Sequence, residues 1–370
     1  MIKPISCLLI LLILIVAQGC TRDDVPTTIN EQPAPTAEPK LTPSNQQGKV
    51  TISSPVSLYR VVELPYSQYT LPSLRNEVLY VPVNENSEFV NSIISIDLKT
   101  LEQDLLFKST FEQSTINDLR ANENWITWVD SAADGSFAKT YARNMDSGVQ
   151  KVITTHTDPN FLKIDSPYLY DDVLAWININ SARDTNPKVV VYNLKNEKIS
   201  TISEVHQYGL YNNFLHIHNG KVLWTDSIDG KGYYKIYDLD SHQLDSYEAP
   251  LKFPGYAQLM DDDIYSINFI DDHDWTSQTF GYYDTKSHVF KSLENKYINR
   301  LVSSDTHVAW TNSDQELILL DARSGKKLNF SKLINHTIDS IECMSDGKTF
   351  IAGYSTNHSS VLYIIDPLKA

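Results

Sequence analysis

The chain has 370 residues, a formal net charge of −15 at pH 7 and 41% hydrophobic residues. This acidic balance argues against nucleic acid as a partner, because phosphate binding needs a basic footprint. It also argues against docking on anionic lipid by charge. The length is sufficient for one large β domain or two ordinary domains.

The first segment has the features of an export signal. Lys3 precedes an apolar run from Leu8 to Val16, and Ala17-Gln18-Gly19 places small residues before Cys20. The apolar run is shorter than the roughly 20 residues that span a bilayer. This favours a cleaved signal peptide over residues 1–19.

This segment resembles the lipobox of bacterial lipoproteins, although position −3 is Ala17 and not the commoner Leu. The resemblance implies cleavage after Gly19 and a lipid on the Cys20 thiol. The mature chain would then be anchored to the cell membrane or the outer membrane, facing outside the cytoplasm. The alternative is an ordinary signal peptide with an incidental cysteine. Removal of Lys3, the only charged residue of the signal, changes the net charge from −15 to −16.

Residues 20–49 are rich in Thr, Pro, Asn and Gln and contain almost no large apolar side chains. Such a composition cannot bury enough surface to fold, which predicts a flexible tether. The tether would hold a domain over residues 50–370 away from the membrane. Cys7 leaves with the signal and Cys20 carries the lipid, so Cys343 is the remaining thiol and no intramolecular disulfide is expected.

From about residue 50 the sequence repeats. Short β-rich runs end in Tyr80, Trp128, Trp176 and Trp224, which are spaced 48 residues apart. A turn signal precedes most copies, and a second strand ending in an apolar-Asp/Asn step follows each one. The further copies are Ile264-Tyr265-Ser266, Val308-Ala309-Trp310 and Phe350-Ile351-Ala352, which brings the number of copies to seven.

A repeat of about 40 to 50 residues with several short strands is typical of a β-propeller. We therefore predict an all-β fold, a seven-bladed β-propeller of four-stranded antiparallel blades. The last copy ends close to Ala370, so its blade lacks an outermost strand. The run Val56 to Leu64 is expected to supply that strand, which would close the ring and remove an exposed edge.

Two turns resemble those of TolB-type propellers. They are Ser345-Asp346-Gly347-Lys348-Thr349-Phe350-Ile351 and Leu320-Asp321-Ala322-Arg323-Ser324-Gly325-Lys326. The resemblance is one of fold and implies a bacterial extracytoplasmic propeller of a kind that often binds proteins. It assigns no catalytic residue, since no motif in the chain matches one.

Two residue groups are candidates for metal binding. His216 and His218 alternate on one strand, so both imidazoles lie on one side, on the expected innermost strand of blade four. With a further ligand such as His206 they would suit a transition metal; the competing interpretation is two polar residues in a solvated channel. Asp271, Asp272, His273 and Asp274 would suit Ca²⁺ in a loop, or form a solvated acidic turn. No cofactor is otherwise indicated.

The favoured function is a non-catalytic, monomeric propeller that binds a protein or another macromolecule of the cell envelope through loops on one face. The loops around 84–92, 131–139, 180–188 and 270–279 are the expected binding surfaces. Phe89 and Trp275 are candidate anchors there, unless they pack on the blades. The alternative is a carbohydrate-active propeller, a polysaccharide lyase or a glycan-binding module, using the channel mouth with metal at His216 and His218. A purely structural envelope protein is the third class.

Overall fold

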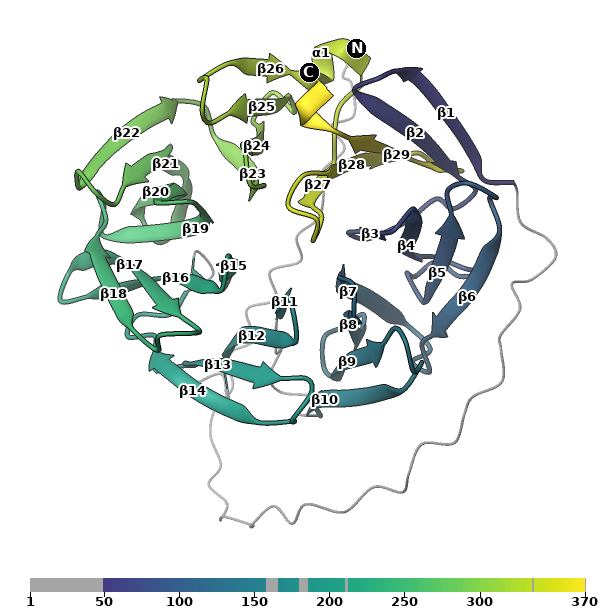
Figure 1. Cartoon of the computed structure of the whole chain (residues 1–370), viewed down its shortest axis with the longest axis horizontal. Coiled ribbons are helices and arrows are strands. Elements are labelled where there is room, and N and C mark those ends of the chain that lie inside the picture. The colour runs from purple at the N-terminus through teal and green to yellow at the C-terminus, as the bar shows by residue number, and fades with distance from the viewer. Residues whose placement is uncertain (1–48, 158–165, 180–185, 210–211, 335, 370) are drawn as a thin grey trace, which may run out of the picture. The chain divides into compact units, whose positions relative to one another are not determined.

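A computed structural model describes residues 49–369, apart from residues 158–165, 180–185, 210–211 and 335. The described residues form seven antiparallel sheets arranged around a channel, with one end strand of each sheet innermost (Figure 1). This confirms the predicted seven-bladed propeller. Within the described residues, no helix is long and apolar enough to cross a membrane.

In each of the first four blades, the strands follow one another in chain order from the channel outward. Blade one has β3 (Ser73–Arg75), β4 (Val78–Val83), β5 (Ser92–Asp97) and β6 (Gln103–Lys108). Blade two has β7 (Ser114–Ala121), β8 (Trp125–Ala132), β9 (Ala138–Asn144) and β10 (Gln150–His156). Blade three has β11 (Tyr168–Tyr170), β12 (Val173–Asn178), β13 (Lys188–Asn193) and β14 (Ile199–Glu204). Blade four has β15 (His216–His218), β16 (Lys221–Ile228), β17 (Lys231–Asp238) and β18 (Leu244–Glu248).

The remaining three blades are also described from the channel outward. Blade five has β19 (Phe253–Met260), β20 (Asp263–Asp271), β21 (Asp274–Asp284) and β22 (Val289–Glu294). Blade six has β23 (Ile298–Ser303), β24 (His307–Asn312), β25 (Leu317–Asp321) and β26 (Lys327–Asn329), followed by the short helix α1 (Phe330–Ile334). Blade seven has β27 (Ser340–Cys343), β28 (Phe350–Ser355), β29 (Ser360–Ile365), β2 (Tyr59–Leu64) and β1 (Thr51–Val56). A 3₁₀ turn, η1 (Pro367–Lys369), follows β29.

The repeated aromatic residue packs between neighbouring blades. Trp128 of β8 is fully buried, stacks on Tyr141 at 5.2 Å between ring centroids and contacts Phe107 of blade one at 5.0 Å. Second strands such as β16 are buried on both sides, because each blade lies between two others. This explains why these strands have nearly continuous apolar sequences and why stacking of blades, not an isolated sheet, stabilises the fold.

The N-terminal strand closes the ring as predicted. β2 pairs antiparallel with β29, from Tyr59 opposite Ile365 to Leu64 opposite Ser360. The strand begins at Tyr59, because a turn at Ser57 separates it from a fifth strand, β1, which covers the outer edge of the blade. The sequence analysis did not predict β1, since its largely exposed Thr and Ser residues lack an apolar alternation.

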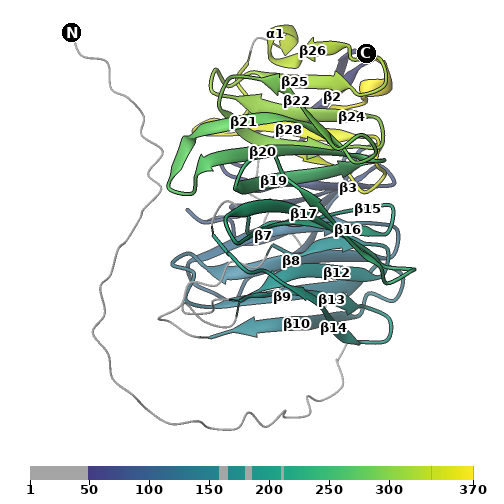
Figure 2. The same ribbon diagram turned by 90° about the vertical axis from the view of Figure 1, so that its left-hand side faces the viewer.

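The antiparallel order gives the ring two faces, visible edge-on in Figure 2. We call one the turn face: it carries the turns between the first and second strands and between the third and fourth. We call the other the loop face: it carries the connections between second and third strands and those between blades. Asn or Asp residues with φ near 50° shape several of the first turns, where these side chains tolerate a left-handed backbone. They are Asn76, Asp171, Asn219 and Asp261.

One predicted loop is wrong. Residues 270–279 form no long loop, because β20 and β21 continue as a hairpin that ends in a two-residue turn, Asp272-His273. Asp271 pairs with Asp274 across this turn, and the Asp271 Oδ1 accepts the His273 N–H at 2.9 Å. The acidic sequence indicated a loop, yet short-range aspartate bonding suits a tight hairpin equally well.

Candidate binding site at the channel mouth

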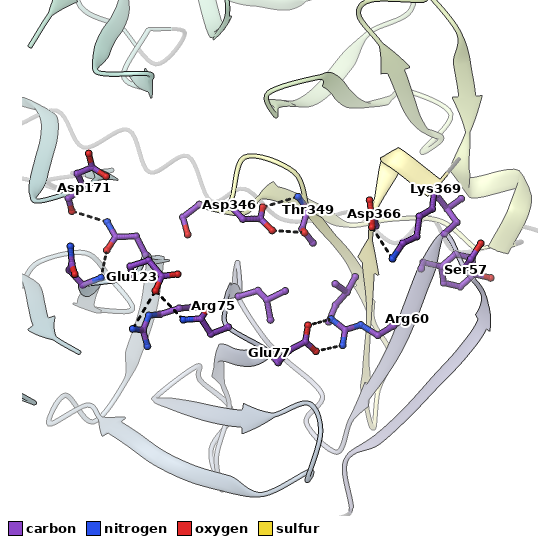
Figure 3. A pocket seen from close by; sticks show the side chains of 18 residues that line it. Ser57, Arg60, Arg75, Glu77, Glu123, Asp171, Asp346, Thr349, Asp366 and Lys369 are labelled. Atoms are coloured by element: carbon purple, nitrogen blue, oxygen red, sulfur yellow. Dashed lines mark hydrogen bonds and ion pairs between the residues drawn. The ribbon is translucent and has the colours of Figure 1, made fainter. Parts of the chain in front are cut away.

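A cavity with a volume of about 820 Å³ opens on the turn face. Its walls come from blades seven, one, two and three, and Figure 3 shows the side chains that line it. Turns far apart in the sequence meet at this cavity because the ring closes between β2 and β29. The site therefore depends on closure of the ring.

Ion pairs hold several charged side chains at the cavity rim. Arg60 forms a bidentate pair with Glu77, and the Arg75 guanidinium lies 3.7 Å from the Glu123 carboxylate (Figure 3). These pairs link neighbouring turns and restrict their side chains. Such exposed pairs add little stability, so their main effect is to fix the shape of the rim.

Acidic side chains dominate the seven turns between first and second strands, all of which lie within the described residues. Their carboxylates come from Glu77, Glu123, Asp171, Asp172, Asp261, Asp262, Asp305 and Asp346, against a single cation, Lys348. The turns between third and fourth strands contain similar numbers of acidic and basic residues. These turns therefore carry an excess of negative charge that would attract cationic groups, while Arg60, Arg75 and Lys369 also line the larger cavity.

A smaller chamber of about 220 Å³ lies beside this cavity. Asn122, Asp171, Ser345 and Asp346 line both, so the two are adjacent. The inner walls of the chamber are formed by aromatic, imidazole and carboxylate side chains. They include Tyr168, Tyr170, His216, His218 and Asp305.

His216 and His218 lie on β15, the innermost strand of blade four, as the sequence analysis expected. Their rings stack with centroids 6.3 Å apart. His216 is buried, and its Nδ1 accepts the backbone N–H of Leu259 at 3.0 Å. Burial lowers the pKa of His218 and holds that of His216 well below its ordinary value. Both rings are therefore neutral at pH 7.

His206, the third ligand considered, has another partner: its Nδ1 lies 2.8 Å from the buried carboxylate of Asp226. Within the described residues, the group of three metal-ligating side chains that comes together is Asp271, Asp272 and His273, with ligand atoms within 4.8 Å of one another. Asp274, on the same hairpin, instead accepts hydrogen bonds from Thr276. This exposed group lies on the loop face, away from the channel mouth.

The two candidate anchors belong to the loop face. Phe89 is half-buried in the loop between β4 and β5, where its N–H donates to Ser87 Oγ at 2.9 Å. The side chain of Trp275 lies outside the described part of the structure. The cavities described above open on the turn face, on the opposite side of the ring. The turns of that face, which the sequence indicated only as strand boundaries, therefore border the candidate site.

A further polar cluster, not predicted from the sequence, lies among residues of β7, β11 and β27. Arg120 Nη1 lies 3.5 Å from Glu342 Oε1, and its guanidinium lies 4.0 Å from the Tyr168 ring centroid. Nearby, burial raises the pKa of Asp118 to about 6, although Arg120 opposes the shift. Asp118 sits in a bulge of β7 with φ of 51°. No local sequence pattern links the residues of this cluster, because they come close to one another only in the folded ring.

No protein-family model matches the chain, and no curated protein matches its sequence. Among solved structures, the chain is similar to an oligogalacturonate lyase in complex with manganese, with 10% identity, a TM-score of 0.55, and coverage of 88% of this chain and 98% of that chain. It is also similar to the Dos1 propeller, with 11% identity, a TM-score of 0.49, and coverage of 86% and 88%. At such identities the similarity to the lyase concerns the fold alone, and the chain is a seven-bladed β-propeller.

Proposed function

We propose that this chain is an extracytoplasmic lipoprotein, anchored through Cys20, whose propeller binds a protein of the cell envelope through the turn face. The observation that carries the proposal is the cavity of about 820 Å³ on that face, which is bordered by turns from four blades. The lipobox-like sequence before Cys20 and the polar tether support the anchored location.

The turn face is suited to rigid display of a binding surface. Aspartates at the turns accept backbone N–H groups, as Asp346 does from Lys348 and Thr349, both at 2.8 Å. Asp321 accepts the N–H groups of Arg323 and Ser324 in the same manner. A preorganised surface loses little conformational entropy on binding, which favours recognition of a partner. The resemblance to TolB-type propellers, which often bind proteins, supports the same function.

The carbohydrate-active alternative draws on the similarity to an oligogalacturonate lyase and on the pair His216 and His218. In this chain the Nδ1 of His216 already accepts the Leu259 N–H. Among the described residues, no third histidine, cysteine or carboxylate ligand atom joins this pair in a metal-binding group. We therefore favour the binding function.

Site-specific photocrosslinking in the native cells tests the proposal. A photoreactive phenylalanine analogue replaces Ser345, an exposed residue that lines both cavities, or Ala133, an exposed residue of the loop face. We expect a discrete protein adduct from the Ser345 position and none from the Ala133 position. An adduct from Ala133 alone, or from neither position, would contradict the proposal.

A further inference from the structure

We propose that the partner presents a basic peptide segment, and that one of its lysine or arginine side chains enters the smaller chamber. This inference rests on the proposed function and adds the chemistry of the partner. The chamber of about 220 Å³ lies beside the larger cavity and is smaller than the roughly 300–1,000 Å³ of pockets for drug-sized ligands. It suits a single long side chain better than a larger ligand.

The charged side chains that line the chamber are all acidic. Asp171, Asp305 and Asp346 line it, and no lysine or arginine is among the described residues of its walls. The Asp305 carboxylate makes no hydrogen bond within the described structure, and the Nδ1 of the neutral His218 lies 3.9 Å from it. Burial raises the pKa of Asp305, while His218 and Lys348 oppose the shift and Asp346 and Asp261 add to it. A cationic side chain beside Asp305 would offset the cost of burying this carboxylate.

Other charged groups near the chamber do not neutralise its carboxylates. Lys348 approaches Asp305 but is exposed and does not line the chamber. Arg120 does not line the chamber, and Glu342 neutralises it. His216 and His218 are neutral at pH 7, because burial lowers the pKa of both rings. The chamber therefore remains negative at the pH at which a lysine or arginine is charged.

His216 provides an independent indication that the ligand is a peptide. Its side chain is 2% exposed, it lines the chamber, and its Nδ1 accepts the Leu259 N–H. The neutral ring therefore carries its proton on Nε2, and this donor has no hydrogen-bond partner among the described residues. In the chamber it is available to an acceptor of the ligand. A peptide supplies carbonyl acceptors beside its cationic groups, whereas a polyamine supplies cations alone.

Peptide binding to the purified full-length protein in detergent tests this inference. The probe is the peptide acetyl-Gly-Arg-Gly-Arg-Gly-Arg-Gly-amide, and the matched neutral probe replaces each arginine by citrulline. Spermine serves as a cation without carbonyl acceptors. We expect the arginine peptide to bind at least tenfold more tightly than the citrulline peptide and more tightly than spermine, by isothermal titration calorimetry at low salt.

Two variants locate the binding. Asp305→Asn is expected to weaken binding of the arginine peptide five- to tenfold, with an unchanged melting temperature. Asp245→Asn removes the same charge from the exposed outer strand β18 and should change the affinity less than twofold. Equal binding of the arginine and citrulline peptides, or equal effects of the two variants, would overturn the inference, as would spermine binding as tightly as the peptide.

The proposed binding face and the proposed basic peptide can be contradicted independently of each other. If these titrations fail while a partner still crosslinks at Ser345, the basic segment is wrong and the binding face stands. If crosslinking at Ser345 also fails, the proposed function is wrong.

Discussion

At the scale of single residues, one repeated position shows how the blades use buried polar groups. The second residue after the packing tryptophan is Asp130 in blade two and Asp226 in blade four, both 1% exposed. Asp226 accepts N–H groups of His206 at 2.9 Å and Gln207 at 3.2 Å. Asp130 accepts one hydroxyl hydrogen bond, from Ser109, and its Oδ1 has no partner among the described residues. Equivalent positions thus differ in how well they satisfy a buried carboxylate.

This difference predicts opposite effects of the same substitution. Burial raises the pKa of Asp130 to about 6, so its folded-state pKa lies above that of the unfolded chain. Below the unfolded-state pKa of about 3.9 the carboxyl group is neutral and does not destabilise the folded protein. Its destabilising effect grows as the pH rises and levels off above about 6. Asp130→Asn should therefore raise the free energy of unfolding by about 1–3 kcal/mol at pH 8, with the gain disappearing near pH 4.

Urea unfolding at pH 4, 6 and 8 checks this prediction. Asp226→Asn is the matched control, because it removes a carboxylate that backbone N–H groups require. We expect the control to lose about 1–3 kcal/mol at pH 8. A loss of stability in Asp130→Asn at pH 8 would contradict the cost assigned to this buried carboxylate.

At the scale of elements, the sequence predicted the blades because two local signals recur in most of them. Apolar second strands carry the packing aromatic, and Asn or Asp residues mark the turns. It failed where local chemistry is ambiguous. Asp271-Asp272-His273-Asp274 suits a loop or a tight hairpin, and the polar strand β1 has no apolar pattern. The chamber could not be predicted from the sequence, since Asp171, His216 and Asp305 come from three different blades.

Ring closure predicts a sharp boundary in N-terminal deletions. Removing the chain through Val56 deletes β1 and the buried Val50 that precedes it, and leaves a four-stranded blade seven. This variant should unfold cooperatively, with a modest loss of stability. Removing the chain through Leu64 also deletes β2, which exposes the edge of β29 and removes the buried Val62 and Leu64 from the core. We expect that variant to aggregate.

Thermal unfolding and size-exclusion chromatography of the two deletion variants distinguish these outcomes. Equal behaviour of the two variants would mean that closure through β2 contributes little. A cooperative, monomeric protein that starts at Pro65 would contradict the role assigned to this strand.

At the scale of the whole molecule, an anchored tether and an acidic binding face would act together. The proposed tether would enlarge the volume that the propeller searches, while the proposed anchor would keep its effective concentration high near the membrane. The carboxylates around the channel mouth would speed encounter with a cationic partner and make binding weaker at high salt. Since the proposed lipid attachment and the proposed binding face lie in separate segments, the two functions should separate by mutation.

The anchor gives a direct prediction. Cys20→Ser should prevent lipidation, because the thiol is the proposed site of attachment. The mutant protein should lose metabolic labelling with a palmitate analogue and should no longer float with membranes in a density gradient. Ser345→Ala, which leaves the signal intact, is the control and should remain membrane-bound. Membrane flotation of Cys20→Ser with unchanged labelling would exclude Cys20 as the attachment site.

Binding through the turn face is tested most sharply by hydrogen–deuterium exchange of the protein alone and in complex with the partner captured through Ser345. We predict slower exchange in the turns around Asn76, Asp305 and Ser345, with no change in the loop at 84–91 or the turn at 133–137. Protection confined to those two loop-face segments would contradict the assignment of binding to the turn face.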